Sequence, residues 1–352
     1  MNGDSSYNVD SCSSCTRSLA EQTSLLLSNL SVSLMLSGNG ELNSRRISEI
    51  SATAERNGFT GLWFGETTLR DASILTAIAA SATKKIQLGT AILNVYTRTP
   101  SQLALLGNTL NEFSGGRFTL GLGVSTAAIV ESWHGINFDH PVARVDETVK
   151  IIRQYFSGER FSAQGKYSSP TNAKLRCSIP PKIALAALND GMIREAALIS
   201  DRIILNLYPT ERIRHAATIV EEVCNRAGKK RPILSVMLYS QIPNDDRGLD
   251  SAKDLISFYA SAPAYSSLFT SLGFHKEANA MLEAWRKKDR DLVKRNVTGE
   301  MIEKLMVLGS MQDLRERVRM YHQAGVNDIL LSPSPFGNYE ENLNEVITNF
   351  KP

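Results

Sequence analysis

Short apolar runs alternate with helical patterns along most of the chain. Runs rich in branched apolar residues are typical of parallel strands that are buried on both faces. The stretches between them place apolar residues at helical spacing, such as Val145, Val149 and Ile152 within Val142–Phe156. The eight runs that predict strands are Ser31–Leu36, Gly61–Gly65, Ile86–Leu93, Arg117–Leu122, Lys182–Ala187, Ile203–Leu207, Ile233–Tyr239 and Asn327–Leu331.

Eight strands that are each followed by a helix predict an α/β fold, the (β/α)8 TIM barrel. An open doubly wound sheet is the alternative, and the count of eight favours the closed barrel. The regular alternation stops at Asp250–Leu308, which has a helical pattern and no clear strand. We therefore predict a helical insertion at about 245–310, before strand eight, within one barrel domain spanning 30–352. Residues 1–29 are expected to form a poorly ordered N-terminal extension.

Composition excludes several kinds of partner. The net charge is +3, from 39 basic and 36 acidic residues, and no basic stripe interleaved with aromatic residues is visible, so we expect no nucleic-acid partner. No apolar run reaches the roughly 18 residues of a membrane span. Cys12 and Cys15 form one CxxC without a second ligand pair, so no zinc site is expected. Four cysteines in 352 residues favour a reducing compartment, and we predict a cytoplasmic protein.

Six segments at the predicted strand ends and helices carry a family resemblance. They are GFTGLWFGE (58–66), QLGTAILNVYTRTP (87–100), SGGRFTLGLGVS (114–125), HPVARVDETVKIIR (140–153), IALAALNDGM (183–192) and VTGEMIEKLMVLGS (297–310). In this order they resemble the luciferase-like monooxygenase superfamily, from about Ser31 to the end of the chain. The sequence is most similar to the branch that uses the deazaflavin coenzyme F420, which includes the methylenetetrahydromethanopterin reductases.

This resemblance implies a cofactor over the carboxyl-terminal mouth of the barrel. In the F420 branch a non-prolyl cis peptide late in strand three lies behind the deazaflavin ring, and the matching bond is Ala91–Ile92. An ordinary trans bond within a buried strand is the alternative. The other residues that the resemblance places at the ring are Met35, Glu66, Thr67, Asn94, Val124 and Ser125.

The loop after strand five is a candidate phosphate site. Its small residues let the backbone come close to a ligand, and the start of the next helix offers free N–H groups and a positive dipole end. In the resemblance, backbone amides of this loop hold the cofactor phosphate. The alternative is that Asn189 or Asp190 only caps the helix. The residues concerned are Ala186, Ala187, Leu188, Asn189, Asp190 and Gly191.

Glu66 is the catalytic candidate. Many relatives carry Asp-His after strand two, where this chain has Glu66 and Thr67, so Glu66 keeps an acceptor while the imidazole is lost. A carboxylate there could orient a ligand group or move a proton. Arg98 could bind an acidic cofactor tail or form a salt bridge.

The resemblance thus implies an F420-dependent oxidoreductase that transfers a hydride between the deazaflavin and a small organic or pterin-type substrate. The alternatives are an FMN-dependent luciferase-like monooxygenase and a non-catalytic flavin-binding relative. By analogy with its relatives, the protein is expected to be a homodimer.

Overall fold

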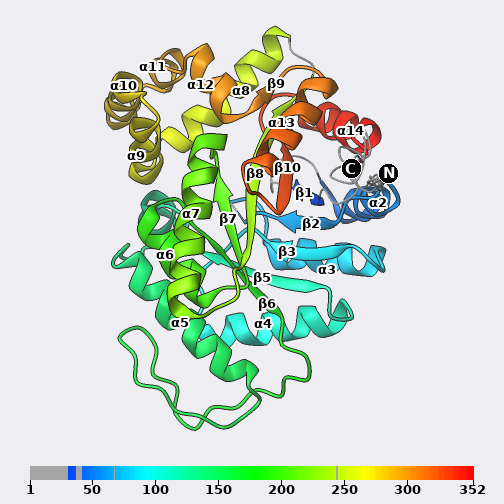
Figure 1. The fold of residues 1–352 in the computed structure, drawn as a ribbon, viewed down its shortest axis with the longest axis vertical. Coiled ribbons are helices and arrows are strands. Elements are labelled where there is room, and N and C mark those ends of the chain that lie inside the picture. The colour runs from blue at the N-terminus through cyan, green and yellow to red at the C-terminus, as the bar shows by residue number, and fades with distance from the viewer. Residues whose placement is uncertain (1–30, 37–41, 67, 243–244) are drawn as a thin grey trace, which may run out of the picture. The chain divides into compact units, whose positions relative to one another are not determined.

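Eight parallel strand positions, called staves below, close into a barrel in the computed structural model, which describes residues 31–36, 42–66, 68–242 and 245–352 (Figure 1). Each stave is one strand, except the third, which consists of two short strands, β3 and β4, in succession. Strand β10 pairs with both β1 and β8, which closes the ring and excludes the open sheet. The strands of the barrel are β1 (Ser31–Leu36), β2 (Gly61–Phe64), β3 (Gln87–Thr90), β4 (Leu93–Asn94), β5 (Phe118–Gly123), β6 (Lys182–Ala186), β7 (Arg202–Asn206), β8 (Ile233–Gln241) and β10 (Asp328–Pro333).

Helices surround the barrel and follow its strands in order, which confirms the predicted (β/α)8 fold (Figure 1). Side-chain caps fix several of their starts. Asp71 accepts hydrogen bonds from the Ser73 and Ile74 amides, and Thr99 forms a capping box with Gln102. The surrounding helices are α2 (Ser44–Arg56), α3 (Ala72–Ala82), α4 (Pro100–Phe113), α5 (Pro141–Phe156), α6 (Asp190–Ile199), α7 (Thr210–Ala227), α13 (Met311–Gln323) and α14 (Tyr339–Asn349).

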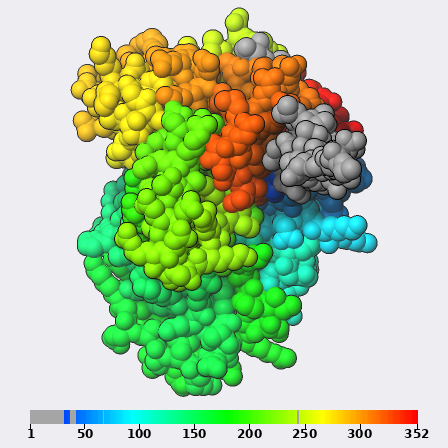
Figure 2. Space-filling model, in the orientation of Figure 1, coloured from blue at the N-terminus to red at the C-terminus, as the bar shows by residue number. Residues whose placement is uncertain are grey.

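The stretch before the last stave is helical, as the sequence predicts. It ends with one strand that the sequence analysis missed, because two residues are too short to form a recognisable apolar run. This strand is β9 (Val307–Leu308), which pairs with β8. Figure 2 shows the insertion in yellow and orange at one end of the barrel. Its helices are α8 (Asp246–Ala260), α9 (Pro263–Ser271), α10 (His275–Arg286), α11 (Arg290–Arg295) and α12 (Gly299–Leu305).

One further prediction on the course of the chain needs correction. The third strand is not continuous over Ile86–Leu93, because the peptide bond between Ala91 and Ile92 is cis and separates β3 from β4. After β5, Ala128–Trp133 forms a short π-helix, η1. Both features follow strands, where periodicity carries no information about local backbone shape.

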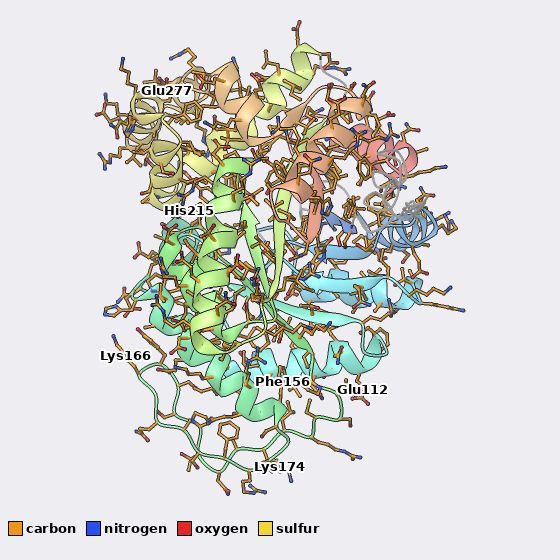
Figure 3. The ribbon with its side chains drawn as sticks, viewed as in Figure 1. Glu112, Phe156, Lys166, Lys174, His215 and Glu277 are labelled. Atoms are coloured by element: carbon orange, nitrogen blue, oxygen red, sulfur yellow. The ribbon has the colours of Figure 1, made fainter. Side chains whose placement is uncertain are left out.

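The segment between α5 and β6 is irregular and lies at the surface, as predicted. Figure 3 shows Lys166 and Lys174 on this segment, away from the barrel. Cys177 is half-buried and Cys224 is buried, and both are free thiols. Within the described ranges, no helix is long and apolar enough to cross a membrane. The same residues contain no cluster of three or more side chains that could hold a metal ion. The Cys12–Cys15 pair and the expected extension lie outside the described residues.

Candidate functional site

A group of polar side chains near the amino ends of the strands shows which strand positions point into the barrel. The Asp328 carboxylate on β10 accepts hydrogen bonds from Ser33 on β1, at 3.0 Å, and from Arg202 on β7, at 2.6 Å. The Arg202 guanidinium also lies 5.0 Å from the Trp63 ring on β2. Strand β7 neighbours neither β1 nor β2, so these side chains meet inside the barrel. Side chains alternate along a strand, which fixes the inward positions above this layer.

Small residues form the floor of the carboxyl-terminal mouth. Two positions above the inward Ser33 and Trp63 lie Met35 and Gly65, and a Cβ atom at Gly65 would approach Met35 Cε to 2.8 Å. A Cβ atom at Gly123 would lie 2.8 Å from Ile92 Cγ1 and 3.2 Å from the Cβ of Ala186. The structure therefore brings together residues from β1, β2, β5 and β6 with the peptide at Ile92. Met35 is only 2% exposed and supports the floor from below.

The predicted cis peptide bond between Ala91 and Ile92, late in the third strand, is confirmed. Its cis configuration is the one that the resemblance implies, and both residues are half-buried. Beyond it, Asn94 is buried, and its Oδ1 accepts a hydrogen bond from the Tyr96 amide at 2.9 Å. The Asn94 Nδ2 group is buried and has no partner in the protein. Because buried polar groups are rarely left unpaired, this amide is a donor available to a ligand.

Glu66 is held by an arginine at the rim of the mouth. Arg98 donates to both carboxylate oxygens, at 2.6 and 2.8 Å, and also to Asp71 Oδ2 at 3.0 Å. Burial lowers the pKa of Arg98, but its hydrogen bonds with Glu66 and the charge of Asp71 outweigh this and raise it above the ordinary value. The salt-bridge interpretation of Arg98 is thereby confirmed. With both oxygens engaged, Glu66 is an oriented acceptor.

The loop after β6 presents the start of helix α6. Asn189 Oδ1 accepts a hydrogen bond from the Met192 amide at 2.9 Å, so the capping interpretation of Asn189 is confirmed. The first amides of the helix, at Asp190 and Gly191, have no partner within it. Ala186 and Leu188 are half-buried, whereas Asn189 and Gly191 are exposed.

Asp190 points to two nitrogen-bearing side chains on α7. Its carboxylate bonds His215 Nε2 at 2.8 Å and Arg212 at 3.2 Å, and Figure 3 shows His215 on that helix. Burial raises the pKa of Asp190, but the hydrogen bond and charge of His215 and the charge of Arg212 lower it overall. Arg212 Nε is buried and has no partner. Sequence reasoning missed Arg212 because this residue follows β7, whereas the predicted phosphate loop follows β6. Its position in the first turn of α7, a helix that also starts at the mouth, was the signal that could have found it.

The other predicted residues have mixed outcomes. Val124 and Ser125 follow β5 and are half-buried, and Ser125 has a left-handed backbone with φ of 59°. Thr67 lies outside the described residues. Tyr208 is fully buried and its hydroxyl donates to the Leu188 carbonyl, so it joins two loops.

None of the predicted site residues lies on the opposite wall of the mouth. Alternation from the inward Arg202, Ser235 and Asp328 predicts that Asn206, Tyr239 and Ser332, four residues later, also face inward. Two insertion residues, Tyr259 and Tyr265, bond to this wall. The period-two pattern on β7, β8 and β10 was the signal that could have found the first three.

Comparisons with known proteins agree with this architecture. The family model described as luciferase-like monooxygenase matches residues 26–328. A 5,10-methylenetetrahydromethanopterin reductase of Archaeoglobus fulgidus is 29% identical over 296 residues, which cover 81% of this chain and 88% of that protein. The chain therefore belongs to the luciferase-like monooxygenase family.

Two solved structures share the fold. A coenzyme F420-dependent tetrahydromethanopterin reductase from Methanopyrus kandleri superposes with a TM-score of 0.78 at 24% identity, covering 91% of this chain and 98% of that one. An F420-dependent secondary alcohol dehydrogenase, in complex with an F420-acetone adduct, has a TM-score of 0.73 at 18% identity and the same coverage. These likenesses establish the luciferase-like TIM barrel.

Proposed function

We propose that this protein is an F420-dependent oxidoreductase that transfers a hydride between the deazaflavin and a small organic or pterin-type substrate. The observation that carries the proposal is the floor of Gly65, Gly123 and Ala186, together with two buried donors that have no partner in the protein, Asn94 Nδ2 and Arg212 Nε. A flat ligand with an anionic tail fits such a surface. The names of the reductase and dehydrogenase relatives support F420 as that ligand.

Different residues of the mouth would hold different parts of the cofactor. When bound, F420 supplies a two-electron carrier of hydride. The small floor residues and the Ala91–Ile92 peptide provide a flat contact surface, and Asn94 offers its amide hydrogens. The free amides at Asp190 and Gly191, together with Arg212, would hold the phosphate at a helix N-terminus. Asp190 is paired with Arg212 and His215, which offsets its charge near that anion.

In the proposed reaction, Glu66 positions a polar group of the substrate or cofactor. Arg98 fixes both carboxylate oxygens, so the remaining lone pairs of Glu66 point in a defined direction. A fixed acceptor orders the reacting groups before the chemical step, which is how positioning lowers a barrier.

FMN is the second candidate cofactor, because it too combines a flat ring system with a phosphate. Separate titrations of the purified protein with F420 and FMN, followed by fluorescence, discriminate the two. We expect saturable F420 binding that is at least about tenfold tighter than FMN binding, a difference of about 1.4 kcal/mol. Tighter FMN binding with oxygen consumption would replace this proposal with a monooxygenase.

A variant of the floor tests where the cofactor binds. Ala186→Leu adds bulk to the half-buried floor, and we expect it to weaken F420 binding by about tenfold or more. Ala163→Leu makes the same exchange at a half-buried position of the surface segment and should leave binding unchanged. Equal affinity in both variants would place the cofactor elsewhere.

We also propose a cytoplasmic homodimer. Helix α3 has no charged residue, and a largely apolar helix on the outside of a barrel is normally covered. Its Ile74 is 61% exposed, and Leu105 on the neighbouring α4 is 56% exposed, which suits contact with a second copy. The free Cys177 and Cys224 suit a reducing compartment. Light scattering after size exclusion should give twice the chain mass, and Ile74→Glu should shift the protein to monomer.

A further inference from the structure

Four uncharged side chains form two hydrogen-bonded pairs at the mouth, opposite the small-residue floor, and a ring contact joins the two pairs. Asn206 at the end of β7 donates through Nδ2 to the Tyr265 hydroxyl of α9, at 2.6 Å. Tyr239 on β8 shares a 2.5 Å hydrogen bond with the Tyr259 hydroxyl of α8. The rings of Tyr259 and Tyr265 are in contact, with centroids 4.6 Å apart. We call these four residues the phenolic wall; half of it comes from the barrel and half from the insertion.

The phenolic wall has hydrogen-bonding capacity that the protein does not use. Asn206 Oδ1 is buried and has no partner. Tyr265 accepts the bond from Asn206, so its own proton remains free to be donated. Ser332 pairs in register with Tyr239, is fully buried, and has an unpartnered Oγ. An acceptor and donors thus lie unused on the inward face, and unpaired buried groups of this kind call for a ligand.

The phenolic wall carries no charge. Burial raises the pKa of Tyr239 and of Tyr265 well above the ordinary value and also raises that of Tyr259, so all three phenols are neutral in ordinary buffers. Among the described residues, no cationic side chain forms a hydrogen bond or ion pair with these four. A carboxylate or phosphate would therefore meet the Asn206 oxygen without a compensating cation, and burying such a charge unpaired is unfavourable.

We propose that the phenolic wall and Ser332 bind an uncharged substrate group that both donates and accepts a hydrogen bond, such as an alcohol hydroxyl or a carboxamide. The insertion would then determine substrate specificity through Tyr259 and Tyr265. This inference rests on the proposed function, because it places the substrate opposite the proposed cofactor floor. It concerns different residues, so the two can be tested apart.

The test uses the full-length protein labelled with 3-fluorotyrosine and observed by fluorine NMR. Tyr→Phe variants at 259, 265 and 155 assign their signals, and Tyr155, which packs against Phe161 of the surface segment, is the internal control. The probes are cyclohexanol, benzamide and benzoate. We expect benzamide and cyclohexanol to shift the signals of Tyr259 and Tyr265 in a saturable way, with Tyr155 unmoved and benzoate without effect. Asn206→Leu should weaken the benzamide response by about tenfold.

The proposal is overturned if benzoate shifts these signals as strongly as benzamide, if neither neutral probe shifts them, or if benzamide binds equally well to Asn206→Leu. Should that variant fail to fold, the comparison of benzamide with benzoate on the wild-type protein decides. The same labelled sample is titrated with F420. Probe shifts without F420 binding would uphold the phenolic wall and reject the cofactor proposal, whereas F420 binding without probe shifts would do the reverse.

Discussion

At the scale of single residues, Glu66 is the side chain for which sequence and structure together define a chemical role most specifically. Its carboxylate was selected because it follows strand two at the mouth. The structure adds that Arg98 donates hydrogen bonds to both oxygens of Glu66 and also pairs with Asp71. The side chain is thus an oriented acceptor, and its two neighbours provide variants that separate charge from position.

Replacing Glu66 tests its part in the reaction. Glu66→Gln keeps the shape but removes the charge, so we expect kcat with reduced F420 and a panel of small carbonyl and pterin substrates to fall by roughly a hundredfold. The Kd for F420 should change much less. Asp71→Asn, which removes a charge from the same cluster but leaves both hydrogen bonds from Arg98 to Glu66 in place, is the matched control and should retain most activity. An unchanged kcat in Glu66→Gln would remove this residue from the mechanism.

His322 gives a second prediction at this scale, on stability. Its Nδ1 donates to the Val326 carbonyl at 2.9 Å, while Nε2 is buried without a partner. Burial lowers the pKa of His322 despite that hydrogen bond. The folded protein therefore takes up this proton less readily than the unfolded chain. The stabilisation is complete above the unfolded pKa of about 6.5 and is lost as pH falls below it toward the folded value.

The measurement is urea unfolding at several pH values between about 7.5 and 5.5, in wild type and His322→Gln. The wild-type free energy of unfolding should fall more steeply on acidification, by at most about 1.4 kcal/mol per pH unit for one proton. Glutamine does not titrate and can still donate to Val326. Parallel pH profiles for the two proteins would show that another group causes the acid sensitivity.

At the scale of elements, the apolar runs predicted every stave of the barrel, because a parallel strand buried on both faces leaves a clear signal. The fourth and fifth runs end at Leu122 and Ala187, beside Gly123 and Ala186 of the floor. Periodicity could not show that the third run is broken at Ile92. A cis peptide depends on backbone geometry, so only the family resemblance pointed to it.

The insertion shows why the rest of the site escaped prediction. Tyr259 and Tyr265 lie on helices whose apolar pattern is satisfied by ordinary packing, and nothing in that pattern indicates which ring reaches the barrel. Their partners, Asn206 and Tyr239, are distant in sequence and meet them only after the insertion folds back. Contacts of this kind depend on tertiary placement, which local spacing does not encode.

At the scale of the whole molecule, the barrel is joined across its interior by the ion pair of Arg202 and Asp328. The two side chains are 14% and 4% exposed, and Asp328 also accepts hydrogen bonds from Ser31 and Ser33. Burial raises the pKa of Asp328 even though Arg202 and these serines oppose it. The pair connects β7 with β10 and, through the serines, with β1. It therefore links the last stave to the first, where the ring closes.

Removing one partner of this pair should be far worse than removing both. Asp328→Ala leaves the Arg202 guanidinium buried without its anion, and we expect a loss of roughly 3–5 kcal/mol in the free energy of unfolding. The double variant Asp328→Ala with Arg202→Met also removes the unpaired guanidinium charge, so it should recover part of the lost free energy of unfolding. Asp250→Ala is the control, since the Asp250 side chain is 65% exposed and Lys294 keeps Asp254 as a partner, so the loss should be at most about 1 kcal/mol. Urea denaturation followed by far-UV circular dichroism measures all three. If Asp328→Ala unfolded at the same urea midpoint as Asp250→Ala, the interior ion pair would have no part in holding the barrel closed.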